Sequence, residues 1–454
     1  MHSEKQYIDL FNAQRDALDS HSASVLNAVR DEAASHFEKI GFPSRKVERY
    51  KYTSIDELFA PDYGVNLNRL QLYPASADGS DNPYKAYRCD VPKLSTSLYF
   101  VINDTFYDKV KPAGKLPDGV KVCSLRQAAA DDPQLIGRYY AKIAATDDDA
   151  ITALNTMYAQ DGLLVYVPTG CKVDRPVQII NILHSPIDMM VNRRVLIVVE
   201  ENASIKLLFC DHAADDRRFL TTQVIETYIG NDASLDLYCM EETHGKSVRV
   251  SNLYIRQLAN SRLNHNIITL HNGISRNRTD VMLAGEGAEC NLCGCVIADK
   301  NQHVDNNTLI THKAAYCTSH ELYKYVLDGA ATGAFAGKVL VEKGAQKTVS
   351  DEVNQNLCAT KEARMWTQPM LEIYADDVKC SHGSTVGQLN NDALFYMQQR
   401  GIPLKEAKTL LQTAFITEVV DHIKLEPLRE RLHYLIEKRF RGELYKCEGC
   451  KLCE

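Results

Sequence analysis

The sequence predicts a mainly β protein with a β-solenoid at its centre and helical segments on both sides. Three observations predict this fold class. Between about 150 and 385, Val, Ile, Leu and Thr alternate with polar residues in short runs that end at Gly, Asn or Asp, as strands do. A short unit recurs along this region with a period near 28 residues. After residue 385 the apolar residues take the three- and four-residue spacing of helices.

The recurring unit is a small residue, any residue, and then an apolar residue or Cys that opens a strand. It starts at 203, 233, 261, 288 and 315, with weaker copies at Ala345 and Ala375. The coils of a solenoid repeat in this way because each coil buries one face against the next. A β-sandwich is the alternative, but its turns seldom keep so even a spacing. We therefore expect a solenoid over 151–385.

The regions on either side of the predicted solenoid have a different pattern of apolar residues. In residues 1–150, apolar positions from Ile8 to Phe37 recur at helical steps until Gly41 and Pro43, and a mixed α/β stretch follows. Residues 386–454 predict a C-terminal helical region with a Cys-rich tail. Asn390 or Asn391 can cap its first helix, and two further helices begin near 404 and 427. These amphipathic helices need a surface to cover, either the solenoid or another protein.

Composition excludes several classes of function. The 454 residues are 45% hydrophobic and 24% charged, which excludes a disordered or fibrous chain. A net charge of −7 gives no basic footprint for nucleic acid or an anionic membrane. The N-terminus has no basic start followed by an apolar core, so we expect no signal peptide and a cytoplasmic location. The 14 cysteines are then expected to be reduced thiols, core residues or metal ligands.

Common enzyme signatures are absent from the sequence. The stretch 333–339, GAFAGKV, is one residue too short for a phosphate-binding loop and has no Ser or Thr after its Lys. No GxGxxG, HExxH or GxSxG motif occurs. A carbohydrate-active β-helix enzyme stays open, but it needs paired carboxylates on one face, and Asp376 and Asp377 alternate faces. A nucleotide-dependent enzyme, a zincin and an α/β-hydrolase therefore have no support in the sequence.

The sharpest chemical signal is the pair Cys380 and His382. Two residues apart on a strand, they project from the same face. A thiolate and an imidazole so placed form a soft half-site suited to iron, zinc or a transient iron–sulfur species. Two other interpretations stay open at this point. Cys380 is a nucleophile activated by the His, or it is a core residue beside a hydrogen-bonded His at a strand end.

Two further cysteine groups occur. In CNLCGC, Cys293 and Cys295 share a face and Cys290 opposes them unless Gly294 marks a bulge, so we interpret all three as core residues. In the tail, the C-x2-C-x2-C spacing brings three thiolates within reach of one metal ion, although a solvated tail is the alternative. The tail residues are Cys447, Cys450 and Cys453.

Several motifs together resemble the SufB/SufD family of iron–sulfur cluster assembly proteins. The resemblance is dense from about 300 to 425 and thin before 200. The stretch CSHGSTVG is closer to the SufD pattern than to SufB, and Tyr50 stands where a Trp is common. The motifs are FPSR at 42–45, ERYKYT at 48–53, FAGKVLV at 335–341, AQKT at 345–348, NQNL at 354–357, PMLEIYADDVKCSHG at 369–383, LFY at 394–396 and RGI at 400–402.

The resemblance implies a right-handed parallel β-helix core, and it implies partners. In that family, SufB and SufD pair through their β-helices, and their C-terminal helical regions dock two copies of the SufC ATPase in a cytoplasmic complex. His382 matches the SufD histidine proposed to act with a SufB cysteine at their interface, and Cys380 matches the adjacent family cysteine. The cofactor implied is iron or an iron–sulfur cluster, held transiently at that interface. The tail cysteines are not part of the family pattern.

The hypothesis from sequence is thus a SufD-like, non-enzymatic scaffold subunit that acts with SufB and SufC. A SufB-like scaffold, or a homodimeric relative that acts without SufB, stays open.

Overall fold

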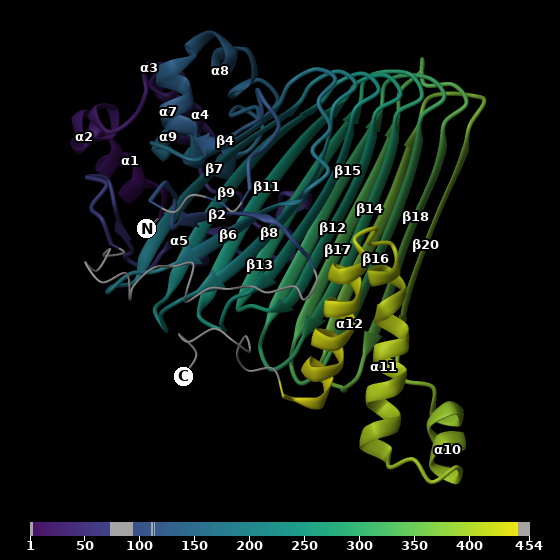
Figure 1. Cartoon of the computed structure of the whole chain (residues 1–454). Coiled ribbons are helices and arrows are strands. Elements are labelled where there is room, and N and C mark those ends of the chain that lie inside the picture. The colour runs from purple at the N-terminus through teal and green to yellow at the C-terminus, as the bar shows by residue number, and fades with distance from the viewer. Residues whose placement is uncertain (1–2, 73–93, 110–111, 113, 444–454) are drawn as a thin grey trace.

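The computed structural model describes residues 3–72, 94–109, 112 and 114–443, and its centre is a β-solenoid. From β5 onwards, consecutive strands alternate between two ten-stranded sheets, so each coil gives one strand to each sheet (Figure 1). From β5 and β6 onwards every strand pairs in parallel with the strand two places along the chain. The predicted mainly β fold with helical flanks is confirmed.

Each sheet has a simple strand order. In chain order, the first sheet contains β4 (Lys121–Ser124), β5 (Leu163–Val167), β7 (Met189–Val199), β9 (Phe219–Ile229), β11 (Ser247–Gln257), β13 (Ile274–Leu283), β15 (His303–His312), β17 (Thr332–Val341) and β19 (Arg364–Ile373), with β1 (Gly64–Val65) beside β7. The second sheet contains β2 (Ser97–Ile102), β3 (Thr105–Tyr107), β6 (Val177–Leu183), β8 (Ser204–Ala213), β10 (Ser234–Glu242), β12 (Arg262–His271), β14 (Glu289–Ala298), β16 (Thr318–Leu327), β18 (Val349–Cys358) and β20 (Lys379–Gly387).

The repeat found in the sequence marks the turns that enter the second sheet. Its apolar positions stack in register, since Leu235 pairs with Ile205 and with Leu263, and Leu263 pairs with Cys290. The residue before each small residue has a positive φ, as at Asn202, Asp232 and Gly287. Asn, Asp and Gly adopt this left-handed conformation at the least cost. The turn chemistry therefore explains the period.

The prediction of the later copies of the repeat is wrong by two to three residues. Cys317, not Ala315, occupies the small position, because Cys290 pairs with Ser319 rather than with Cys317. The left-handed residues at these turns are Tyr316 and, one coil on, Lys347. Neither residue type marks such a turn in a sequence, so the spacing alone misplaced the copies at 315 and 345 by two and three residues.

The N-terminal helices cover the outer face of the first sheet. Phe11, Phe37 and Met157 form one apolar cluster with Met190 and Leu220 on β7 and β9. The helix expected over the first 40 residues is present but broken into four pieces. The helical elements are α1 (Glu4–Ala13), α2 (Arg15–Ser20), α3 (Ser24–Asn27), α4 (Arg30–Ile40), the 3-10 turn η1 (Glu48–Tyr50), α5 (Ile55–Phe59), α7 (Leu125–Asp131), α8 (Pro133–Tyr139) and α9 (Ala150–Tyr158).

The boundary expected near residue 150 is not a boundary between sheets. β2 and β4 precede it and already belong to the two sheets, while α9 follows directly. The division into 1–150, 151–385 and 386–454 therefore remains a prediction about domains, with strands of the solenoid on both sides of its first limit.

The C-terminal helices cover the outer face of the second sheet. They are α10 (Asn391–Gln399), α11 (Leu404–Asp421) and α12 (Glu426–Arg441). Leu428, Leu432 and Ile436 pack with strand residues such as Tyr238 and Cys295. Asn390 caps α10 by accepting from two backbone N–H groups, as its sequence predicts. The solenoid thus provides the surface that α11 and α12 need, whereas α10 projects beyond it (Figure 1).

The last coil, formed by β19 and β20, is the least covered. Every residue of β7 is buried, whereas almost every residue of β20 is exposed. β19 and β20 end their sheets, and the chain leaves for α10 after Gly387. The solenoid is therefore open at this end.

Candidate functional site at the open end of the solenoid

Cys380 and His382 lie on β20, the last strand of the second sheet. In register with β18, Cys380 pairs with Ser350 and His382 pairs with Glu352. Ser350 and Glu352 are buried on the interior side of the solenoid. Because paired strands in register place their side chains on the same face, Cys380 and His382 continue two interior columns to the open end. The structure confirms that the two residues share a face.

The two residues differ in accessibility. Cys380 is half-buried and packs against an apolar cluster that includes Val339, Val341 and Ala375. Burial raises the pKa of the Cys380 thiol, which keeps it protonated and argues against an activated nucleophile. His382 is exposed. An imidazole on an exposed edge strand can reach a ligand that arrives from another molecule.

Beneath His382 lie two carboxylates that sequence reasoning missed. Glu352 pairs with His382 in the next coil, and Glu321 pairs with Glu352 one coil deeper. Both are fully buried, and burial raises the pKa of each carboxyl well above its ordinary value. A spacing of about one repeat between Glu321, Glu352 and His382 is the signal that could have revealed them.

A second interior column, which includes Leu235 and Leu263, becomes polar beyond Cys290 and ends at Cys380. It continues through Ser319 and Ser350, whose hydroxyls are hydrogen-bonded at 2.8 Å. His312 Nε2 lies 2.9 Å from the Ser319 hydroxyl. The interior of the last coils is therefore polar along two columns.

A separate polar network lies deeper in the solenoid and is balanced in charge. Arg193 donates to Asp211 at 2.8 Å, and Arg249 donates to Asp211 at 3.2 Å and to Glu241 at 3.1 Å. Asn181 donates to the same Asp211 oxygen as Arg193, and Ser275 donates to the Glu241 oxygen that Arg249 does not contact. All four carboxylate oxygens are thus satisfied, which is expected of a structural network.

The cysteines of CNLCGC are core residues, as expected. Cys290 belongs to the apolar interior of the solenoid, and Cys293 and Cys295 lie on the outer face beneath the C-terminal helices. Burial raises the pKa of Cys293 and of Cys295 to about 12, so both remain thiols. Cys447, Cys450 and Cys453 lie outside the described residues, so their role stays a prediction. Within the described part of the chain, no three His, Cys, Asp or Glu side chains are gathered as a metal site.

The N-terminal motif ERYKYT has a structural role. Arg276 lies over the Tyr50 ring at 3.8 Å, and the Thr53 hydroxyl donates to Asp305 at 2.6 Å. Tyr52 stacks on Trp366 of β19 at 5.3 Å between ring centroids. The motif therefore attaches the N-terminal region to the outer face of the first sheet as far as the last coil.

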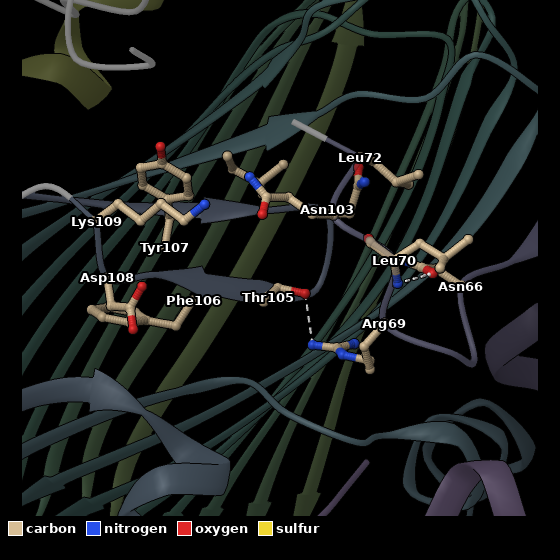
Figure 2. Close-up of a pocket in the computed structure, with 12 residues that line it drawn as sticks. Asn66, Arg69, Leu70, Leu72, Asn103, Thr105, Phe106, Tyr107, Asp108 and Lys109 are labelled. Carbon is tan, nitrogen blue, oxygen red and sulfur yellow. Dashed lines mark hydrogen bonds between the residues drawn. The ribbon is translucent and has the colours of Figure 1, made fainter. Parts of the chain in front are cut away.

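A cavity of about 200 Å³ lies at the other end of the second sheet, beside β2 and β3 (Figure 2). Arg69 lines it but donates to Asp104 and Thr105, each at 2.7 Å. Its guanidinium is therefore held by protein oxygens. The cavity is separate from the strand that carries His382.

Large apolar side chains are exposed on two C-terminal surfaces. On the last coil they are Trp366, Ile373, Tyr374 and Val386. On α10 and α11 they are Phe395, Tyr396, Leu404 and Leu410. Exposed apolar groups next to unpaired strand edges are typical of surfaces that bind other proteins. The fold and this site together define a β-solenoid protein whose open end exposes apolar side chains and free strand edges.

Comparison with known proteins identifies the class. The model of the SUF system FeS cluster assembly SufBD core domain matches residues 182–415, and that of the SufBD protein N-terminal region matches residues 1–179. The chain belongs to the SufBD family of the SUF iron–sulfur cluster assembly system.

Individual relatives agree along most of the chain. An iron–sulfur cluster assembly SufBD family protein of Synechocystis is 28% identical over 92% of this chain and 91% of its own length. The SufD proteins of Escherichia coli and Bacillus subtilis are 25% and 26% identical, over 90% and 71% of this chain and 93% and 74% of their own lengths. Among the described residues, no helix combines the length and the apolar character needed to span a bilayer.

Proposed function

We propose that this chain is the SufD-like scaffold subunit of a SUF complex in the cytoplasm, and that it has no catalytic site of its own. The observation that carries the proposal is His382, which is exposed on the terminal edge strand of an open solenoid. The iron–sulfur cluster is the product assembled there. His382 supplies one imidazole ligand to nascent cluster iron, and a thiolate of the partner supplies another.

The proposed partner at the open end is a SufB-type solenoid. An unpaired strand edge can be extended by the strand of another chain, and β19 and β20 are both such edges. The exposed Trp366, Tyr374 and Val386 add apolar area around them. A SufB-like role or a homodimer would use the same edges.

The proposed partner at the C-terminal helices is a SufC-type ATPase. α11 and α12 are anchored on the second sheet, where Arg439 donates to Asp299 at 2.9 Å and Lys324 pairs with Glu418. The apolar groups Phe395, Tyr396 and Leu404 remain exposed on α10 and at the start of α11. A motion of the ATPase would reach the solenoid through these anchored helices and change the junction at β20.

Substitution of His382 tests the proposal. In the reconstituted complex, His382→Ala is expected to abolish cluster formation, measured by anaerobic visible absorbance, while leaving complex assembly intact. His320→Ala is the matched control, since His320 is another exposed histidine of the second sheet, paired with Asp351 on an outer face. A normal cluster yield from the His382→Ala variant would contradict the assignment of His382 as a ligand of the cluster.

The partner surfaces can be tested separately. Replacing Phe395 and Leu404 by Ser is expected to prevent co-purification with the ATPase while leaving the fold unchanged. If the isolated chain instead assembles a stable cluster by itself, and does so without His382, the SufB-like or homodimeric alternative is favoured. Cys447, Cys450 and Cys453 are then the residues to replace together.

A further inference from the structure

The solenoid interior contains a pair of acidic side chains for which the described residues offer no counter-charge. Glu321 on β16 and Glu352 on β18 are register partners in neighbouring coils, with exposed fractions of 1% and 0%. In the described part of the chain, none of their four carboxylate oxygens has a hydrogen-bond partner. Buried polar atoms without partners are rare, because each costs the free energy of its lost hydration.

The opposite sheet contributes to the same space. Thr308 on β15, with an exposed fraction of 2%, faces Glu321 and lowers its pKa somewhat, but its hydroxyl does not meet the geometry of a hydrogen bond and has no other partner among the described residues. Gly337 on β17 faces Glu352, and a Cβ at this position would lie 2.3 Å from Glu352 Oε1. A glycine here leaves room for the carboxylate. The space is therefore lined with oxygen atoms from both sheets.

Charge makes the arrangement unusual. Burial and the charge of Glu321 are the influences that raise the pKa of Glu352, and no cationic side chain of the described residues opposes them. Deeper in the same interior, Asp211 and Glu241 are paired with Arg193 and Arg249. A buried carboxylate pair without such a partner must take up protons or bind a cation.

We propose that Glu321, Glu352 and Thr308 form an internal binding site for one divalent cation. Two carboxylates balance a charge of +2, and carboxylate and hydroxyl oxygens are the donors that hard cations prefer. Since no three His, Cys, Asp or Glu side chains converge among the described residues, water completes the coordination. His382 lies directly above Glu352 in the next coil, at the open end through which a cation enters.

The natural occupant inferred is Fe²⁺, and this choice rests on the proposed function. The site itself does not, because its oxygen atoms are present whatever the role of His382. Fe²⁺ held one coil below His382 would be available to the surface where the cluster is assembled. The donors are hard enough for Mn²⁺ to replace Fe²⁺ as a probe.

Titration of the full-length chain with Mn²⁺ tests the site. The electron paramagnetic resonance signal of free Mn²⁺ is expected to disappear until one equivalent is bound, and Fe²⁺ added anaerobically should displace it. Glu321→Gln/Glu352→Gln is expected to abolish this binding. Glu372→Gln is the matched control, because Glu372 is a solvent-accessible carboxylate of the last coil, paired with Lys338, and its loss should leave binding unchanged.

Three further measurements keep the result decisive. Circular dichroism checks that the Gln variants fold, and Thr308→Val, which keeps the side-chain shape, is expected to weaken Mn²⁺ binding about tenfold. His382→Ala should retain Mn²⁺ binding even where it abolishes cluster formation, so the site and the proposed function can fail separately. Wild-type chain that binds no Mn²⁺, or a folded double Gln variant that binds it as tightly as wild type, would overturn the proposal.

Discussion

Two regions of the solenoid interior carry acidic pairs, and they differ in how these pairs are satisfied. Asp211 and Glu241 lie in the middle coils, where arginines, Asn181 and Ser275 satisfy all four carboxylate oxygens. Glu321 and Glu352 lie towards the open end, where none of their four oxygens has a partner within the described residues.

The two regions also differ in how far helices cover the outer faces of their strands: the middle coils are covered and the last coil is not. N-terminal helices pack on the outer face of the first sheet over β7, β9 and β11, and the C-terminal helices cover the second sheet. β20, beyond Glu352, is almost entirely exposed, whereas most of β19 is half-buried. A polar interior is therefore not by itself a sign of function in this protein. The region of the proposed cation site differs in that its two carboxylates have no hydrogen-bond partner among the described residues and lie next to an exposed terminal strand.

The largest expected effect comes from breaking the balanced network. Arg249→Met removes the cation shared by Asp211 and Glu241 and leaves buried charge unpaired, so we expect a loss of about 3–5 kcal/mol in the free energy of unfolding. Urea denaturation measures it. The control is Arg262→Gln, which breaks an exposed ion pair with Glu289 between coils and should cost at most about 1 kcal/mol. If both substitutions lowered the free energy of unfolding equally, the buried network around Arg249 would be no more important for stability than the exposed ion pair of Arg262.

Replacing Glu321 and Glu352 should increase the free energy of unfolding rather than decrease it, and the size of this effect should depend on pH. The two carboxyls have raised pKa values in the folded chain, so between the ordinary value of about 4.5 and about 9 the folded state binds more protons than the unfolded state. Stability contributed by this pair is therefore present at low pH and is lost as the pH rises through neutrality. Glu321→Gln/Glu352→Gln should remove this dependence and stabilise the chain by about 1–3 kcal/mol at pH 8 in chelator.

Adding a divalent cation gives a further test with the same measurement of stability at pH 8. Mn²⁺ stabilises the folded state in proportion to its binding, so it should raise the stability of the wild-type chain at pH 8 and leave the double Gln variant unchanged. A wild-type chain with no pH dependence beyond that of the variant would show that the two carboxylates are satisfied in solution.

A smaller effect is expected in the neighbouring column. Ser350→Ala removes the hydrogen bond between Ser319 and Ser350 from a buried position, and we expect a loss of about 1 kcal/mol. Thermal unfolding at a single pH measures it. A loss as large as that of Arg249→Met would mean that this column, too, is a network rather than a single bond.

The smallest expected effect on stability belongs to His382. Because the side chain is exposed on an edge strand, His382→Ala should change the free energy of unfolding by less than about 0.5 kcal/mol, although it is expected to abolish cluster formation. Thermal unfolding and cluster yield are to be measured on the same preparation. A large loss of stability would show that His382 has a structural role in the fold.

Local features were predictable where a residue type has one strong conformational preference. Asn390 was expected to cap α10 and does so. The turns at Asn202, Asp232 and Gly287 revealed the period of the solenoid because these residue types tolerate a positive φ. The same turn at Tyr316 and Lys347 uses residues without this preference, so the register there followed only from strand pairing.

By itself, the sequence determined the class of fold, the helical flanks and the shared face of Cys380 and His382, because each depends on a period of two, on helical spacing or on a repeat. Only the tertiary structure decided which of the two is accessible and that Glu321 and Glu352 lie beneath His382. These facts depend on the stacking of residues about 30 positions apart and on where the stack ends. Burial and the absence of a counter-charge are properties of neighbours, and neighbours in a solenoid come from other coils.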